Sequence, residues 1–113
     1  DISVILPVFI NLVDNAVFWL TKTPVEQNRK IIFDVNSKNE ILVYDNGPGF
    51  SNLTEKLIFE RGFSTKPGGR GLGLFISKQV LNQEHFDINI IEPILGKGAS
   101  YKITQLEERD IDE

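Results

Sequence analysis

The sequence lacks cysteine altogether and contains one histidine, His85. Without cysteine, disulfides and thiolate metal sites are excluded, and a single histidine argues against a multi-histidine zinc centre. Positive charge is not in excess either, because the net charge is −4. No basic face can therefore dominate, which argues against broad nucleic-acid binding. The 113 residues suit one domain with a real core. Because the sequence has no initial Met and no charged leader, we expect a domain of a longer protein.

One apolar run, residues 4–20, could be mistaken for a membrane span. It is interrupted by Asn11, Asp14 and Asn15. A mid-helix Asp costs roughly 2.5–3.5 kcal/mol on insertion, and the run is at the short limit of about 17–25 residues. The pattern favours a buried core helix. Its polar residues then require hydrogen-bond partners or a functional role.

Hydrophobic periodicity and turn signals predict helices over 3–21, 53–60 and 71–83, and strands over 30–35, 40–45, 87–92 and 100–106. Ser3 is the expected cap of the first helix, and Pro7 is tolerable only near its first turn. This order predicts an α+β domain over residues 1–106, with a mixed, mainly antiparallel sheet covered on one face by about three helices. We expect the acidic tail, 107–113, to be frayed and disordered.

Glycines cluster just ahead of the third helix, in the run Gly-Arg-Gly-Leu-Gly-Leu at 69–74. Glycines at a helix start leave backbone N–H groups open to an anion such as phosphate. The spacing does not fit the dinucleotide motif G-x-G-x-x-G. It also does not fit the Walker loop, because Gly98 follows the only Gly-Lys pair. The kind of phosphate site must therefore be identified from the other motifs in the sequence.

Two asparagines, Asn11 and Asn15, lie four residues apart and therefore on one helix face. They suit a hydrated Mg²⁺ and phosphate oxygens, or they cap a neighbouring loop or strand edge. Asp45 ends the second strand ahead of Gly47 and Gly49. The Asp45 carboxylate could accept a hydrogen bond from the exocyclic amine of adenine, because the glycines have no side chains that would block a flat base. Alternatively, Asp45 could belong to a plain turn.

Two basic residues, Lys66 and Arg70, precede the glycine run. They are natural partners of phosphate oxygens. The alternative is an ordinary solvated basic loop.

Five segments of the sequence, taken together, resemble the ATP-binding catalytic domain of the sensor histidine kinases. That family belongs to the GHKL or HATPase superfamily with the Bergerat fold, which also holds gyrase, large heat-shock chaperones and mismatch-repair ATPases. The matching segments are an N box at 11–16, glycine boxes at 45–49, 69–74 and 96–100, and an F-box segment at 58–66. The resemblance spans about residues 2–105 and implies a two-layer α/β sandwich.

This resemblance implies a role for each matching residue. Asn15 would be the Mg²⁺ ligand, and the catalytic set would be Asn11, Asn15 and Lys66. Asp45 would bind the adenine amine. The other expected nucleotide contacts are Gly47, Gly49, Phe59, Lys66, Arg70, Gly71, Leu72, Gly73 and Ser100.

Asn11 stands where the hydrolysing relatives carry a glutamate that activates water. An amide cannot act as a general base, so the sequence favours phosphoryl transfer over hydrolysis. By the resemblance, Mg-ATP would donate its γ-phosphate to a histidine on a separate dimerisation domain, with a response regulator as a further partner. His85 lacks the surroundings of such an acceptor. We expect a cytoplasmic domain that contacts neither nucleic acid nor membrane, although its parent protein could be membrane-anchored.

Two alternatives stay open. One is a GHKL-type ATPase. The other is a degenerate nucleotide-binding regulatory or interaction module, because Phe18 and Trp19 stand where many relatives carry a polar or charged residue that reaches the nucleotide. Ser100 replaces the usual Thr, which is a mild change.

Overall fold

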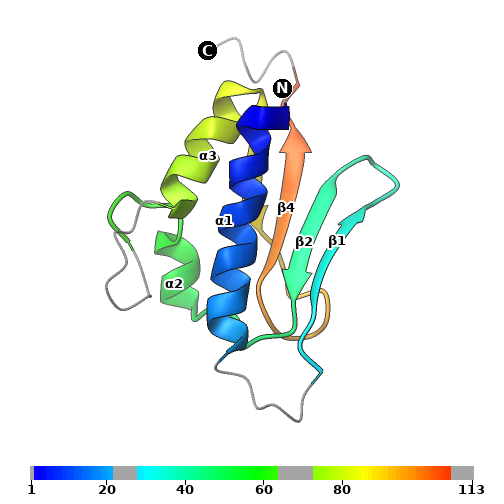
Figure 1. Ribbon diagram of the computed structural model, residues 1–113, viewed down its shortest axis with the longest axis vertical. Coiled ribbons are helices and arrows are strands. Elements are labelled where there is room, and N and C mark those ends of the chain that lie inside the picture. Colours follow the sequence, from blue (N-terminus) through cyan, green and yellow to red (C-terminus); the bar gives the residue numbers. More distant parts are fainter. Residues whose placement is uncertain (1, 22–27, 64–72, 108–113) are drawn as a thin grey trace.

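The computed structural model describes residues 2–21, 28–63 and 73–107. Three helices and four strands occur in the described part (Figure 1): α1 (Ile2–Leu20), β1 (Ile31–Val35), β2 (Ile41–Asp45), α2 (Asn52–Leu57), α3 (Gly73–Gln83), β3 (Phe86–Ile90) and β4 (Ser100–Gln105). The predicted elements therefore exist, with ends displaced by up to three residues. The predicted tail lies outside the described residues, apart from Glu107.

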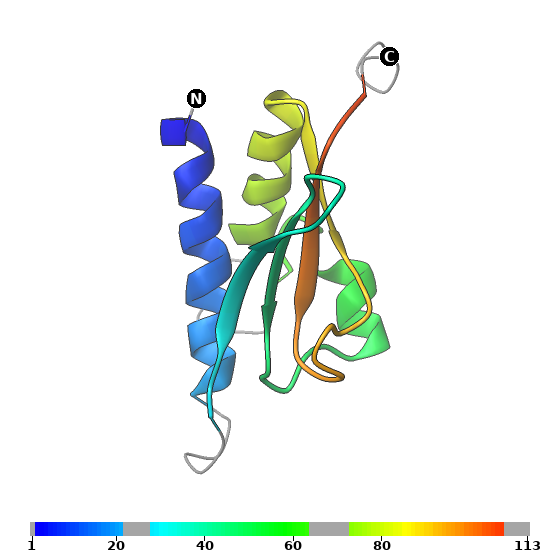
Figure 2. The same ribbon diagram turned by 90° about the vertical axis from the view of Figure 1, so that its right-hand side faces the viewer.

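The four strands form one sheet in the order β1-β2-β4-β3, and every pairing in it is antiparallel. Figure 2 shows α1 and α3 on one side of this sheet, whereas α2 stands apart from that pair. The N-terminal end of α1 and the end of β4 are both at the top of Figure 1, although Figure 2 shows them apart. Residues from the C-terminal half of α1, the end of β2 and the start of β4 line a common cleft at the other end of the sheet. This arrangement confirms the predicted α+β fold class.

Helix α1 begins at Ile2, so Ser3 lies inside its first turn and is not the predicted cap. Pro7 is consequently the sixth residue of the helix, beyond the first turn, where its missing N–H removes an intrahelical hydrogen bond. The helix is long and apolar enough to cross a membrane by length and composition, with 22% of its 18-residue window buried. Here its inner face packs on the sheet through Val8 and Leu12, which are almost fully buried.

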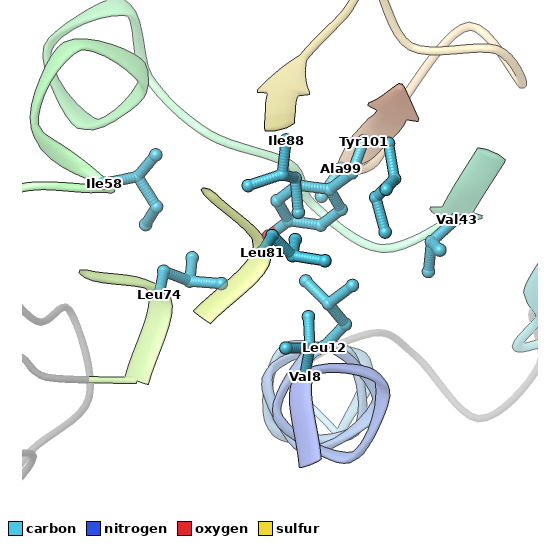
Figure 3. Close-up of a cluster of buried hydrophobic side chains, with 10 residues drawn as sticks. Val8, Leu12, Val43, Ile58, Leu74, Leu81, Ile88, Ala99 and Tyr101 are labelled. Carbon is cyan, nitrogen blue, oxygen red and sulfur yellow. The ribbon is translucent and has the colours of Figure 1, made fainter. Parts of the chain in front are cut away.

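The core lies between the helix pair and the sheet (Figure 3). Val8 and Leu12 of α1, with Leu81 of α3, point toward Ile88 and Tyr101 on the sheet. Each fully buried aliphatic side chain of this kind contributes roughly 1.5–3 kcal/mol. Ile58, directly after α2, is also buried and ties that short helix to the same core.

A left-handed residue makes the turn between α3 and β3. His85 has a φ of 66°, is exposed, and accepts a hydrogen bond from the Leu106 N–H through its backbone carbonyl. The single histidine therefore lies in the surface turn between α3 and β3, at the top of Figure 1.

Candidate functional site

Asp45 is the last residue of β2 and is 5% exposed. Its Oδ1 accepts hydrogen bonds from the backbone N–H of Gly47 at 2.8 Å and of Ala99 at 3.3 Å. Its own N–H donates to the Ala99 carbonyl at 3.0 Å. Within the described residues no hydrogen bond ends on Oδ2. One carboxylate oxygen is thus fixed by the backbone, and the other is left for a ligand.

Two glycines allow this backbone to approach so closely. A Cβ on Gly98 would lie 2.0 Å from the Asp45 carbonyl oxygen and 2.9 Å from its Oδ1, and Gly98 also has a φ of +86°. Gly49, with a φ of +76°, packs on the Gly98 carbonyl, which a Cβ would meet at 3.1 Å. Both positions favour glycine for conformation and for space. The first and last glycine boxes of the sequence are therefore one structural unit around Asp45.

Burial raises the pKa of the Asp45 carboxyl above its ordinary value of 3.8, against the opposing effect of the two backbone N–H donors. No cation pairs with it in the described part of the chain. A buried carboxyl without a cation is costly to ionise. A ligand that donates a hydrogen bond to Oδ2 would relieve part of that cost.

Beside Asp45 lies a small cleft. Its walls come from α1, from the loop after β2 and from the start of β4: Asn15, Ala16, Trp19, Asp45, Gly49, Phe50, Ala99 and Tyr101. The cleft encloses about 230 Å³ with its open mouth included.

The two asparagines of α1 differ in their surroundings. The Asn11 Nδ2 donates to the Gly73 carbonyl at 3.3 Å and to Ser77 Oγ at 3.2 Å, and Ser77 Oγ donates to the same carbonyl at 2.8 Å. Asn11 therefore joins α1 to the first turn of α3. Asn15 lines the cleft, and its side chain has no hydrogen bond among the residues that the structure describes. Its amide oxygen is available for a ligand or a metal ion.

Gly73 begins α3, so the start of this helix faces the Asn11 side of α1. The first N–H groups of a helix have no partner within the helix and suit an anion. The other predicted phosphate contacts, Lys66, Arg70, Gly71 and Leu72, lie outside the described residues.

Four predicted contacts in the described part of the chain do not line the cleft: Gly47, Phe59, Gly73 and Ser100. The Ser100 side chain is 1% exposed, and its Oγ accepts a hydrogen bond from the Ile94 N–H at 3.0 Å. Phe59 packs on the core, with Lys78 Nζ 4.9 Å from its ring centroid. Their roles toward a nucleotide stay predictions.

Five cleft residues were not predicted as contacts: Ala16, Trp19, Phe50, Ala99 and Tyr101. The alternation of β4 could have found two of them. Ala99 and Tyr101 share one face of the strand, whereas Ser100 faces the other way. Once Asp45 is placed in the pocket, the register Tyr44↔Ser100 puts the side chain of Ala99 next to that of Asp45.

An antiparallel sheet under two helices, with a glycine-supported aspartate beside an asparagine-bearing helix, defines the class of GHKL-type ATP-binding domains. Residues 1–109 match the family model described as histidine kinase-, DNA gyrase B- and HSP90-like ATPase. The chain belongs to this family.

The similar proteins are sensor kinases. A probable C4-dicarboxylate sensor kinase of Halalkalibacterium halodurans is 33% identical over 82% of this chain and 18% of its own length. The sensor protein CitS of the same organism is 36% identical over 83% of this chain and 18% of its own length. This chain thus spans about a fifth of the length of these curated relatives.

Solved structures of histidine kinases are also similar to this chain. The mycobacterial sensor histidine kinase MprB has a TM-score of 0.68 at 28% identity, over 93% of this chain and 71% of that one. A nucleotide-free catalytic domain of the histidine kinase ThkA has a TM-score of 0.69 at 28% identity, over 95% of this chain and 71% of that one. The chain therefore has the fold of histidine kinase catalytic domains.

Proposed function

We propose that this domain binds Mg-ATP at the Asp45 cleft and donates the γ-phosphate to a histidine on a separate dimerisation domain. The environment of Asp45 is the observation that carries the proposal. Asp45 is buried, and its Oδ2, which has no partner in the described part of the chain, suits the exocyclic amine of adenine. The glycine backbone around it leaves room for a flat base.

The residues present suit Mg²⁺ as part of a nucleotide complex. No group of three or more His, Asp or Glu side chains able to hold a metal occurs among the described residues. Mg²⁺ keeps several waters and takes one or two protein ligands when phosphates supply the rest. The Asn15 amide oxygen in the cleft wall is such a ligand. When bound, the ion would neutralise phosphate charge during transfer.

Phosphoryl transfer fits this site better than hydrolysis. Asn11 holds the position where a water-activating glutamate would act, and its amide cannot accept a proton. Its Nδ2 is engaged with the Gly73 carbonyl and Ser77 Oγ. The nucleophile would come with the acceptor histidine, and catalysis would consist of holding the triphosphate in place.

The partners follow from this chemistry. The acceptor histidine lies on a dimerisation domain of the parent protein or on another chain, and a response regulator receives the phosphate in turn. Such a reaction requires the cytoplasm, where ATP is available, even if the parent protein is membrane-anchored.

The first test compares Asp45→Asn with Asp34→Asn, a matched control on the exposed part of β1. A hydrogen bond to a charged group is worth about 1.5–3 kcal/mol. We therefore expect Asp45→Asn to weaken ATP binding about 10- to 100-fold by calorimetry, with Asp34→Asn unchanged. Equal ATP affinity in the two variants would show that adenine does not bind at the Asp45 cleft.

The second test addresses the metal and the reaction. Asn15→Ala should abolish the Mg²⁺ dependence of ATP binding and the labelling of an added histidine-bearing dimerisation domain by γ-labelled ATP. Persistent Mg²⁺ dependence would make Asn15 structural. Rapid phosphate release by the wild type without an acceptor would favour an ATPase, and ATP binding with no acceptor ever labelled would favour a regulatory module.

A further inference from the structure

Helix α1 is apolar on more sides than its packing on the core uses. Asp14 is the only charged residue within Ile2–Leu20, yet only 22% of the apolar window of this helix is buried. A helix that packs by one stripe usually carries polar residues on its opposite side. Here the outer side exposes Leu6, Ile10 and Val17, each by about half of its surface. Helix α1 therefore has apolar surface beyond what the core covers.

This apolar surface continues from α1 onto the edge strand β1. Phe9 of α1 meets Phe33 of β1, with ring centroids 5.6 Å apart. Side chains alternate along a strand, so Val35 lies on the same face of the sheet as Phe33. Phe33 is 46% exposed and Val35 is 59% exposed, although α1 and α3 lie on this side of the sheet. We call the surface formed by Leu6, Phe9, Ile10, Phe33 and Val35 the α1–β1 face.

A groove lies on this face between α1 and β1. Its walls are Phe9, Phe33, Asp34, Val35 and Ile41, and it encloses about 690 Å³ with its open side included. In Figures 1 and 2 the β1–β2 hairpin leans away from the N-terminal half of α1, which opens this space. Contiguous exposed apolar surface on a folded domain marks an interaction site.

Acidic side chains border the α1–β1 face. Asp34 lines the groove, and Asp14 is exposed on α1 one turn after Ile10. Neither carboxylate forms an ion pair within the described residues. The α1–β1 face and the walls of the groove contain no Lys or Arg. A partner with an apolar centre and a cationic rim would therefore match this surface in both burial and charge.

Two other occupants fit less well. A second copy of this chain, bound through the same face, would bring further carboxylates and no cation. A strand added to the edge of β1 would need the outward N–H groups of that strand. The Val35 N–H points outward, because the next N–H, that of Asn36, pairs with the Glu40 carbonyl. Asp34 Oδ1 already accepts from this Val35 N–H at 2.8 Å. A helix pairs its own backbone groups and needs no such edge.

We propose that the α1–β1 face binds an amphipathic helix of a partner protein, which lays its apolar stripe in the groove and places Lys or Arg beside Asp14 and Asp34. Packed helices lie about 8–10 Å apart, so this helix would lie beside α1 and over β1. Such helices bind through side chains at i, i+3, i+4 and i+7. No residue lines both this groove and the Asp45 cleft, so the proposal does not depend on ATP binding.

The test titrates the 113-residue chain with a peptide of leucine and lysine of about 18 residues, or five helical turns, with its leucines on one face. A peptide with glutamate in place of lysine tests the requirement for charge. Ile10→Gln combined with Val35→Gln removes apolar surface from the face. Leu53→Gln combined with Ile76→Gln is the matched control, because both are exposed apolar residues of other helices. Fluorescence anisotropy gives the affinities, amide NMR shifts locate the binding, and thermal unfolding checks that each variant is folded.

We expect the lysine peptide to shift amide signals of α1 and β1. The double variant of the face should bind this peptide at least about tenfold more weakly, because two apolar contacts are lost, and the control variant should match the wild type. The glutamate peptide should bind the wild type at least about tenfold more weakly than the lysine peptide. Equal affinities of the two variants, equal affinities for the two peptides, or shifts confined to other elements would overturn the proposal.

Two further measurements test the other occupants. Sedimentation equilibrium should show a monomer, and co-sedimentation with phosphatidylcholine vesicles should leave the chain in solution. A dimer that the double variant of the face abolishes would replace the partner helix by a second copy. Vesicle binding that the same variant abolishes would replace it by a lipid surface. Either result would overturn the proposal.

Discussion

Two aspartates in neighbouring regions of this small domain are held in opposite ways. Asp45, at the end of β2, is held by two backbone N–H groups with no cation, and its pKa is raised. Asp87, in β3, forms a 2.8 Å ion pair with Lys78 and also accepts from the Asn82 amide and the Ile88 N–H. Burial opposes ionisation of Asp87, but these partners together lower its pKa.

The difference distinguishes a candidate ligand-binding site, at Asp45, from a cluster that stabilises the fold, at Asp87. Lys78 also donates to the Ile88 carbonyl at 2.9 Å and lies over the Phe59 ring, so the Asp87 cluster ties α3 to β3 and to the segment after α2. Its polar groups are satisfied within the fold. Within the part of the chain that the structure describes, the polar groups at Asp45 and Asn15 are incompletely satisfied, which suits a ligand-binding region.

The largest expected effect on stability comes from a substitution that disrupts the backbone packing around Asp45. Gly98→Ala would place a Cβ 2.0 Å from the Asp45 carbonyl oxygen at a φ of +86°. We expect a loss of at least about 3 kcal/mol in the free energy of unfolding, measured in urea.

Gly96→Ala is the matched control, since it has a φ of +81° and nothing within 4 Å of the added Cβ. It should cost only about 1–2 kcal/mol, the penalty of a left-handed alanine. Equal losses at the two glycines would mean that the close approach of Gly98 to Asp45 does not hold in solution.

The next effect is an opposite pH response of the two aspartates. Because the folded pKa of Asp87 is lowered, its carboxylate stabilises the fold above pH 3.8, and this contribution is lost as the pH falls through the folded pKa. Asp87→Asn should therefore cost about 1 kcal/mol at pH 7, for a half-exposed pair, and less in acid.

Asp45 has a raised folded pKa, so its ionised form opposes folding above that pKa, and the penalty disappears as the pH falls below 3.8. Asp45→Asn should be at least as stable as the wild type at pH 7, even though it loses ATP binding. Urea unfolding of both variants from pH 3 to 8 measures the contrast, and slopes of the same sign would contradict it.

The smallest expected effect concerns Ser77, which directly precedes Lys78 on α3. Ser77→Ala removes its hydrogen bonds with Gly73 and Asn11 but leaves the direct Asn11 contact to the Gly73 carbonyl. We expect a loss of about 1 kcal/mol in unfolding free energy, with ATP affinity within twofold. A larger loss of affinity would give the α1–α3 junction a part in binding.

Much of the fold could be predicted from local signals. Alternation and turn residues placed all four strands to within two residues. The sheet was predicted as mixed and mainly antiparallel, whereas every pairing in the described part is antiparallel. The helix ends were less certain. Ser3 was predicted as a cap, but α1 begins at Ile2 and includes it. The structure shows a cap at Ser51, which was not predicted and whose Oγ accepts from the Thr54 N–H at 3.1 Å.

The sequence by itself determined the class of this protein, because residue types and their order along the chain carry the family motifs and the periodicity of its elements. Only the tertiary structure decided which side chains share the cleft. Asp45 meets Ala99 from 54 residues away through the register of β2 on β4, and a shift of one residue would exchange the faces of β4. That register places Tyr101 beside Asp45 and turns Ser100 toward Ile94. Spacing along a chain specifies local faces, whereas contacts across a sheet depend on packing the whole core.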